Sequence, residues 1–196
     1  MTTIRLKIPV LVDLMFVWPA LLYRLLRYGW AYRKIPLGEG RWTIVDPLIY
    51  YWLNSYHWTS DARGECIYAI RHKVSRKGRS TIVRMHREIM NAPAGLLVDH
   101  RNNNTLDNRR ENLRLATQSQ NMQNRRKCRT KATSQFIGVF FDKNCGKWRA
   151  KIGHQGKYIY LGIFDNELDA VKAYDAAARK YYGEFARLNF PEEAYI

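Results

Sequence analysis

Cysteine is scarce in this sequence, and the few that are present lie far apart. Cys66, Cys128 and Cys145 form no Cys-x-x-Cys pair. Structural zinc sites usually take their ligands from such pairs, and disulfide-rich secreted domains use an even number of cysteines. The pattern argues against a zinc ribbon and indicates a reducing, intracellular compartment, so we expect a cytoplasmic protein.

Long apolar runs are also missing. The most apolar stretch, residues 8–26, is interrupted by Asp13 and Pro19. Its unbroken part, residues 14–23, is far shorter than the ~20 residues that a membrane-spanning helix requires, and it lacks the small-residue cleavage site of a secretory signal. We predict an amphipathic or buried helix without stable membrane insertion. Contact with an anionic membrane surface is the alternative.

Acidic residues are few compared with basic ones. The chain has 33 Lys and Arg against 17 Asp and Glu, a formal charge of +16. This excess favours a polyanionic partner, either nucleic acid or an acidic membrane surface, over a merely soluble basic protein. The 196 residues are 46% hydrophobic and 13% aromatic, which is ample for one or two folded domains.

The densest polar pattern lies in residues 96–124, LLVDHRNNNTLDNRRENLRLATQSQNMQN. A short apolar run that ends in Asp99-His100 is typical of a strand, and residues 112–116 predict a second strand that returns from an Asn-rich loop. Thr117, with Gln120 three residues later, predicts a capping box and a helix. On that helix Asn121, Asn124 and Arg125 would share one face.

These residue types suit phosphodiester hydrolysis. Neutral imidazole can take a proton from water near pH 7, so His100 is the candidate general base. Asp99 and Asn121 offer the oxygen ligands that Mg²⁺ prefers, and Asn112 is placed to orient the imidazole. Because adjacent strand residues point to opposite faces, Asp99 and His100 can serve one site only if the strand ends or twists there. The alternative is a polar hairpin whose asparagines only make turns.

The stretch resembles the HNH endonuclease family, in the variant whose metal-site histidines are replaced by Asp and Asn. The matching residues are Val98-Asp99-His100, Leu106-Asp107-Asn108-Arg109, Glu111-Asn112-Leu113-Arg114-Leu115 and Ser119-Gln120-Asn121. The resemblance extends back to about Tyr28. It implies a ββα-metal fold, one divalent ion (Mg²⁺ or Mn²⁺) held by Asp99 and Asn121, His100 as the base, and Asn112 as its orienting partner.

The segment before this motif predicts a small antiparallel sheet. Strands are expected at residues 42–45, 66–71 and 82–86, with a short helix after Asp46-Pro47. The aromatics and arginines of residues 28–41 suit either phosphate contact with stacking or a small aromatic core beneath arginine stems.

His86 and the turn at residues 75–80 complete this part of the chain. We expect His86 to be packed rather than to bind a ligand. The turn, SRKGRS, is expected to be a solvated loop, although in a nuclease it can touch the DNA backbone.

A basic segment follows the predicted helix. Residues 125–134 contain almost nothing apolar and cannot bury enough surface to fold alone, so we predict a linker. Arg125 and Arg126 would add salt-sensitive phosphate contacts along a duplex.

Residues 135–191 predict a second compact module. Strands are expected at residues 136–141, 147–153 and 158–164, and a helix runs from an N-cap at Asn166 to Gly183. The middle strand puts Lys147, Arg149 and Lys151 on one face and Trp148, Ala150 and Ile152 on the other. The first face, with Tyr158 and Tyr160, is a basic, aromatic surface of the kind that enters the major groove.

This module resembles the plant ethylene-response-factor (Apetala-type) DNA-binding domain. The residues that carry the resemblance are Ile137-Gly138-Val139, Gly146-Lys147-Trp148-Arg149-Ala150-Lys151-Ile152, Tyr160-Leu161-Gly162-Ile163-Phe164, Ala173-Tyr174-Asp175-Ala176-Ala177 and Leu188-Asn189-Phe190-Pro191. Where the plant proteins have arginines, this chain has Ile137, Phe140 and Gly153. The resemblance therefore implies binding to double-stranded DNA but no particular target sequence.

Together these features predict an α+β protein. We expect an N-terminal extension (1–40), an HNH nuclease domain (41–127), a basic linker (128–134) and a three-stranded antiparallel sheet with a helix (135–191). The arrangement resembles the free-standing homing endonucleases of phages and mobile elements. The alternative function is a sequence-specific DNA-binding regulator whose HNH fold does not cut.

Overall fold

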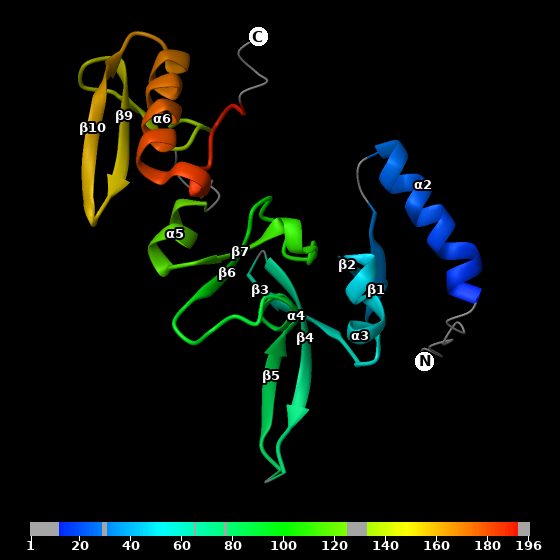
Figure 1. The fold of residues 1–196 in the computed structure, drawn as a ribbon. Coiled ribbons are helices and arrows are strands. Elements are labelled where there is room, and N and C mark those ends of the chain that lie inside the picture. The colour runs from blue at the N-terminus through cyan, green and yellow to red at the C-terminus, as the bar shows by residue number, and fades with distance from the viewer. Residues whose placement is uncertain (1–11, 29–30, 65, 77, 125–132, 192–196) are drawn as a thin grey trace. The chain divides into compact units, whose positions relative to one another are not determined.

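A computed structural model describes residues 12–28, 31–64, 66–76, 78–124 and 133–191 (Figure 1). The chain divides into two compact units between Leu115 and Ala116, and each unit is described by itself. Helices and small antiparallel sheets alternate along the chain, which confirms the α+β class. The finer boundaries expected at residues 41, 128 and 135 stay predictions.

The first unit begins with the helical segment that the sequence predicts. It comprises a π-helical turn, η1 (Asp13–Val17), and α2 (Trp18–Tyr28). Asp13 is buried and accepts hydrogen bonds from the Arg33 guanidinium and the Tyr51 hydroxyl, so a polar contact anchors the helix. No helix among the described residues is long and apolar enough to cross a membrane.

Two strands and a helical turn follow. β1 (Arg33–Gly38) pairs antiparallel with β2 (Arg41–Val45), and η2 (Pro47–Ile49) leads into α3 (Tyr50–Asn54). The strand β1 was not anticipated. The Arg33 guanidinium lies 3.8 Å from the centroid of the Tyr50 ring, as in the aromatic-core alternative for this segment.

A three-stranded sheet comes next, with strand order β3-β4-β5. β3 (Thr59–Arg63), which the sequence pattern did not reveal, pairs with β4 (Cys66–Val74), and β4 pairs with β5 (Ser80–Arg84). The expected strand at residues 82–86 ends at Arg84, because the chain turns there into α4 (Met85–Ile89). The apolar core of this unit consists of Ile35, Leu37, Val45, Leu53, Trp58, Ala69, Met85, Ile89, Val98 and Leu113.

The polar stretch forms the predicted strand, loop and strand. β6 (Leu97–His100) and β7 (Leu113–Ala116) make a two-stranded sheet, and the 3₁₀ turn η3 (Arg110–Asn112) precedes β7. The next helix, α5 (Gln118–Gln123), belongs to the second unit. Thr117 and Gln120 form the predicted capping box.

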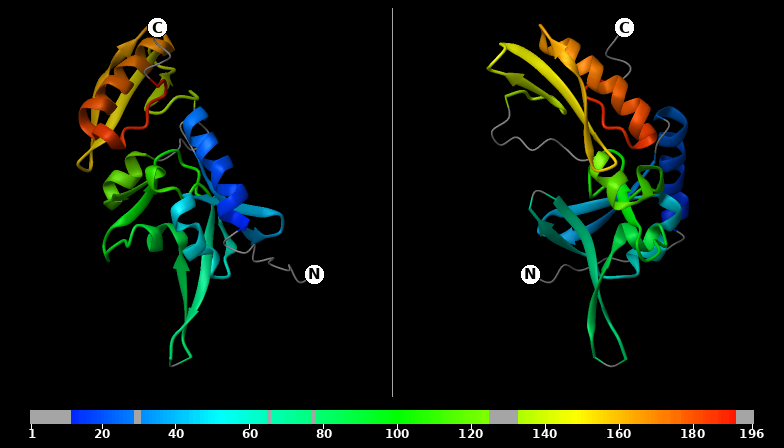
Figure 2. Two further views of the ribbon diagram at one scale, coloured as in Figure 1. Left: turned by 45° about the vertical axis from the view of Figure 1, so that its right-hand side comes forward. Right: turned by 90° about the vertical axis from the view of Figure 1, so that its left-hand side faces the viewer.

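The second unit contains the predicted three-stranded sheet and helix. β8 (Val139–Asp142), β9 (Lys147–His154) and β10 (Lys157–Phe164) lie in the order β10-β9-β8, and α6 (Glu167–Tyr182) runs along one face of the sheet (Figure 2). Asn166 caps the helix as predicted, and the turn η4 (Gly183–Phe185) follows it. The buried core between sheet and helix consists of Val139, Ala150, Ile152, Ala170, Val171, Tyr174 and Ala178.

Candidate active site and nucleic-acid interface

The carboxylate at the end of β6 is held by an arginine of the neighbouring strand. The Nε and Nη2 atoms of Arg114 lie 2.8 and 2.7 Å from Oδ2 of Asp99. Both side chains are buried. A buried charge is tolerated when it is paired and hydrogen-bonded, so Arg114 both neutralises Asp99 and fixes its orientation.

His100 is buried directly after Asp99 and has a different partner. Its Nε2 lies 3.3 Å from Oδ1 of Asn108, and the Nδ2 of Asn108 donates to Thr43 Oγ1 at 2.8 Å. The Thr43 hydroxyl in turn donates to the carbonyl of Leu106 at 2.7 Å. Asp99 and His100 thus have different partners, and β6 ends at His100, where a site shared by both residues requires the strand to end.

This chain of hydrogen bonds selects one tautomer of the imidazole. The hydroxyl proton of Thr43 is directed to Leu106, so its oxygen acts as the acceptor for the amide nitrogen of Asn108. The amide oxygen of Asn108 therefore faces His100, and the ring nitrogen that meets it must carry a proton. In the neutral ring the proton is on Nε2 and the basic lone pair is on Nδ1.

A second histidine packs against the first. The rings of His86 and His100 meet edge to face with centroids 5.2 Å apart, and Tyr68 lies on the other side of His86 at 5.6 Å. Burial lowers the pKa of His86 to about 3, and burial also lowers the pKa of His100, against the opposing effect of the Asn108 hydrogen bond. Both rings are therefore neutral at pH 7, and His86 is packed, as expected.

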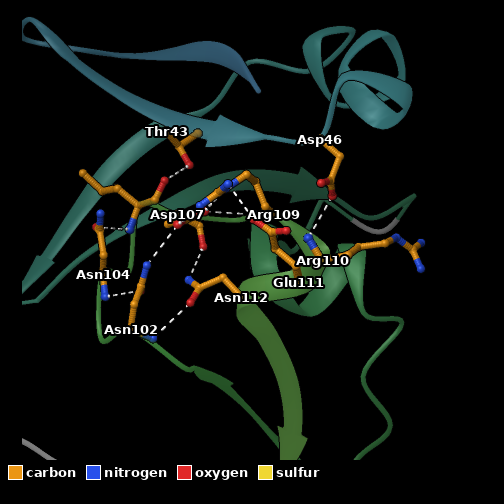
Figure 3. Close-up of polar contacts among 10 residues, drawn as sticks. Thr43, Asp46, Asn102, Asn104, Asp107, Arg109, Arg110, Glu111 and Asn112 are labelled. Atoms are coloured by element: carbon orange, nitrogen blue, oxygen red, sulfur yellow. Dashed lines mark hydrogen bonds and ion pairs between the residues drawn. The ribbon is translucent and has the colours of Figure 1, made fainter. Parts of the chain in front are cut away.

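Asn112, the residue expected to orient the imidazole, is engaged elsewhere. Its Oδ1 accepts from the backbone N–H of Asn102 at 3.0 Å, and its Nδ2 donates to the carbonyl of Asp107 at 2.8 Å (Figure 3). It ties together the loop between β6 and β7. His100 donates instead to the amide oxygen of Asn108, because that loop folds back and brings Asn108 to the Nε2 edge of the ring.

The same loop is organised around Asp107. This buried carboxylate accepts from Arg109 Nε and Nη2 at 2.9 and 2.8 Å and from Asn102 Nδ2 at 3.0 Å (Figure 3). Burial alone raises the pKa of Asp107, but the hydrogen bonds and positive charge of Arg109 outweigh it and lower the pKa below its usual value. Asp107 is therefore an ionised structural anchor.

Backbone hydrogen bonds dock this loop onto β2. The Ile44 N–H donates to the Leu106 carbonyl, and the Asn108 N–H donates to the Ile44 carbonyl, both at 2.9 Å. The sequence comparison had included Asp107 and Asn108 in a motif without giving either a role. The run of asparagines at residues 102–104, just before them, is the local signal.

The two residues expected to hold a metal ion lie in different units. Asp99 is on β6, and the half-buried Asn121 is on α5 of the second unit. Among the described residues, no three His, Cys, Asp or Glu side chains cluster as metal ligands would. One carboxylate and one amide oxygen nevertheless suit Mg²⁺, which keeps several waters and uses substrate phosphate.

The exposed face of the second sheet combines cations with aromatic rings. Lys147 pairs with Asp165 at 2.9 Å, and Arg149 pairs with Asp142 at 2.6 Å. Within the described part of the chain, the buried Nε of Arg149 has no hydrogen-bond partner.

The third cation of this face lies over aromatic rings. The Nζ of Lys151 lies 4.5 Å from the centroid of the Tyr158 ring and 5.2 Å from that of Phe140. Tyr158 and Tyr160 are 76% and 54% exposed, so both rings lie on the surface of the sheet. Arg125 and Arg126, predicted to add phosphate contacts, lie outside the described residues.

In a comparison with known proteins, two stretches of the chain match two different family models. Residues 91–123 match the family model of the HNH endonuclease, and residues 134–184 match that of the AP2 domain. The first match covers β6, the loop, β7 and α5, and the second covers the three-stranded sheet and all of α6. Both resemblances noted in the sequence are thereby confirmed.

Similar curated proteins align with the second part of the chain. APETALA2-like protein 2 of Oryza sativa subsp. indica is 45% identical over 67 residues, which are 33% of this chain and 15% of that protein. The AP2-like ethylene-responsive transcription factor TOE2 of Arabidopsis thaliana is 45% identical over 58 residues, 30% of this chain and 12% of that protein. Dehydration-responsive element-binding protein 2D of the same plant is 51% identical over 49 residues, 24% of each chain. This chain thus spans a quarter or less of each relative.

Proposed function

We propose that this protein is a metal-dependent DNA endonuclease that hydrolyses phosphodiester bonds and is positioned by its AP2-type sheet. The observation that carries the proposal is the state of His100. Within the residues that match an HNH endonuclease, this imidazole is buried, neutral and held in one tautomer by Asn108. A fixed, neutral imidazole is the group that general-base catalysis requires.

In the proposed mechanism, Nδ1 of His100 accepts the proton of the attacking water. Thr43 and Asn108 hold the ring so that this nitrogen keeps its lone pair. Asn112 acts through the loop that carries Asn108, because it binds that loop at Asn102 and Asp107. Holding the reacting groups in place lowers the entropic part of the activation free energy, which accounts for large rate enhancements in enzymes.

Asp99 and Asn121 are the proposed ligands of a divalent ion, Mg²⁺ or Mn²⁺. When bound there, such an ion would supply positive charge to the scissile phosphate and to the leaving 3′ oxygen. Arg114 fixes the carboxylate of Asp99 through Oδ2 and thereby prepares it for binding.

DNA binding is assigned to the second unit and the basic segment before it. We propose that Lys147, Arg149, Lys151, Tyr158 and Tyr160 face the major groove, with Arg125 and Arg126 on the phosphates. This basic face and the identity to AP2-type transcription factors support the proposal. The proposed setting is a phage or mobile element in a bacterial cytoplasm, where such a nuclease would act in homing.

Plasmid cleavage tests this function directly. Supercoiled plasmid is incubated with Mg²⁺ or Mn²⁺, with and without chelator, using the wild-type protein and His100→Ala. We expect metal-dependent nicking or linearisation that falls by about 10²–10⁴-fold in the variant, with DNA affinity unchanged. The matched control is His57→Ala, which removes a histidine outside the site. Equal cleavage by His100→Ala and wild type would disprove the assignment of the base.

One observation favours a second candidate, a DNA-binding regulator that does not cut. The carboxylate needed for the metal is already paired with Arg114, and the relatives of the second unit are named transcription factors. Tight, salt-sensitive binding without cleavage of any DNA, including DNA from the source, would establish the regulator instead.

A further inference from the structure

A two-stranded ribbon extends from the first unit, away from the candidate active site. β4 and β5 continue well past the sheet core, and Figures 1 and 2 show them as a long hairpin pointing away from the rest of that unit. We call residues 72–82 the arm. Every described residue of the arm is exposed to solvent.

The arm keeps a regular strand pairing and a closed turn, although its side chains are exposed and pack against no apolar core. The register continues to the pair Val74 and Ser80, and the turn is closed by hydrogen bonds from Ser75 N–H to the Arg79 carbonyl at 2.8 Å and from Gly78 N–H to the Ser75 carbonyl at 2.9 Å. Gly78 has a φ of +74°, a conformation that suits glycine. A ribbon exposed on both faces is at best marginally stable in water by itself, so its surface is available to a partner.

The charge of the arm has one sign. Residues 66–87 contain no Asp or Glu, and four of the Lys and Arg residues in that stretch, Lys73, Arg76, Lys77 and Arg79, belong to the arm. Among the described residues, no carboxylate pairs with Lys73, Arg76 or Arg79. Nearer the core, by contrast, Arg71 is bound to Glu88 at 2.6 Å. The cations at the tip are therefore available to a polyanion.

The two faces of the arm differ in character. His72 lies opposite Ile82, and Val74 lies opposite Ser80, so these four side chains share one face, which carries neither Lys nor Arg. The contact between His72 Nδ1 and Ser80 Oγ, at 3.3 Å, lies on this face. Val74 and Ile82 are 67% and 49% exposed. The opposite face carries Lys73.

We propose that the arm enters the major groove of duplex DNA, with Lys73, Arg76 and Arg79 on the phosphates and the His72–Ile82 face against the base edges. The major groove admits a two-stranded ribbon, and apolar side chains contact the methyl group of thymine there. Phosphate contacts position a protein on the duplex, and base contacts read its sequence. The arm thus gives the first unit a DNA contact of its own, separate from the AP2-type sheet.

Salt dependence of binding tests the phosphate contacts. The variant Arg76→Ala/Arg79→Ala and the control Lys172→Ala/Lys180→Ala, which removes the same charge from α6, are compared in the full-length chain. Both carry His100→Ala, so binding is measured whether or not the protein cleaves. The probe is a mixed-sequence duplex, and fluorescence anisotropy is followed over a range of NaCl concentrations.

We expect the slope of log Kobs against log[NaCl] to be less steep by about 1.8 in the arm variant, about 0.9 for each lost contact, and unchanged in the control. Both proteins should keep the wild-type thermal midpoint, because the substituted side chains are exposed. The same slope in both variants would overturn the phosphate contacts.

Cross-linking tests entry into the groove. A duplex in which 5-bromodeoxyuridine replaces thymidine places bromine where the thymine methyl group lies in the major groove. After irradiation, mass spectrometry should find cross-links to peptides containing residues 72–82. These cross-links should be lost in Arg76→Ala/Arg79→Ala and kept in the α6 control. Cross-links confined to peptides of the second unit would overturn entry of the arm.

Discussion

In the first unit, polar side chains are buried together, whereas in the second they lie mainly on the surface. Buried polar residues around the first site are Thr43, His86, Asp99, His100, Asp107, Asn108, Asn112 and Arg114, and those of the second unit are Asn124, Ser134 and Asp175. The second core is built from small apolar residues and rings, and its cations point outward. The contrast fits the two proposed roles, catalysis in the first unit and DNA binding in the second.

Chemistry requires fixed groups in a dry environment, because desolvation keeps His100 neutral and hydrogen bonds hold its ring. Recognition of a polyanion requires exposed cations, whose contacts are made outside the fold. We therefore expect substitutions of the buried polar residues in the first unit to lower both stability and activity. Substitutions on the sheet of the second unit should change affinity alone, and only its core should control its stability.

The largest expected effect is at Asp107. Asp107→Ala removes the buried carboxylate that binds Arg109 and Asn102 and leaves Arg109 with the exposed Glu111, so the first unit should lose about 3 kcal/mol of unfolding free energy. Hydrogen exchange measured by mass spectrometry should show faster exchange in residues 33–115 and no change in residues 139–182. Uniformly faster exchange in both units would show that their stabilities are coupled.

Gly138→Ala is the matching test in the second unit. Gly138 has a φ of +74°, and an added Cβ would lie 2.0 Å from a carbon of the Tyr174 ring. Overpacking in a filled core costs about 1–3 kcal/mol, and the positive φ adds to it. Hydrogen exchange should accelerate in the sheet and α6, and DNA affinity should fall. The exposed control, Gly146→Ala, has the same kind of positive φ but open space around it. Equal destabilisation by both would rule out the ring contact.

A pH effect of intermediate size is expected from His86. The pKa of His86 is about 3 in the folded protein and ~6.5 in an unfolded chain, so the unfolded state takes up the proton first. Stability is therefore fully present above pH ~6.5 and falls below it by up to about 1.4 kcal/mol per pH unit, which amounts to about 2 kcal/mol at pH 5. His86→Phe keeps an aromatic ring and should flatten the pH dependence of urea unfolding between pH 7 and 5. Parallel curves for wild type and variant would exclude the buried neutral state.

The smallest effect concerns the orientation of the base. Thr43→Val removes the acceptor that orients Asn108, whereas Thr43→Ser keeps it. We expect cleavage to fall about tenfold in the first variant and to stay near wild type in the second, with similar DNA affinity in both. Nitrogen NMR of the His100 ring should show the Nε2-protonated tautomer in wild type and Thr43→Ser. The same tautomer and the same rate in Thr43→Val would remove Thr43 from the mechanism.

Local pattern was sufficient for most of the elements. Thr117 and Gln120 form the capping box, Asn166 caps α6, and the alternation of β9 places its cations on one face, as predicted. The strands β1 and β3 were missed for different reasons. β1 buries Ile35 and Leu37 alternately, but Pro36 interrupts its pattern. β3 has almost no apolar residues and is defined by its pairing with β4.

The sequence by itself was sufficient to predict which local elements carry the residues of the candidate site, because strand ends, helix caps and turns depend on neighbouring residues. Only the tertiary structure decided their partners. Asn108, and not Asn112, is hydrogen-bonded to His100, and Asn108 is held in place by Thr43, which lies 65 positions earlier in the chain. Asp99 binds Arg114 because the strands that carry them, β6 and β7, are paired. Position 138 likewise requires glycine, because the Tyr174 ring of α6 occupies the space that a Cβ would need. Such contacts depend on the packing of distant segments, which no local pattern encodes.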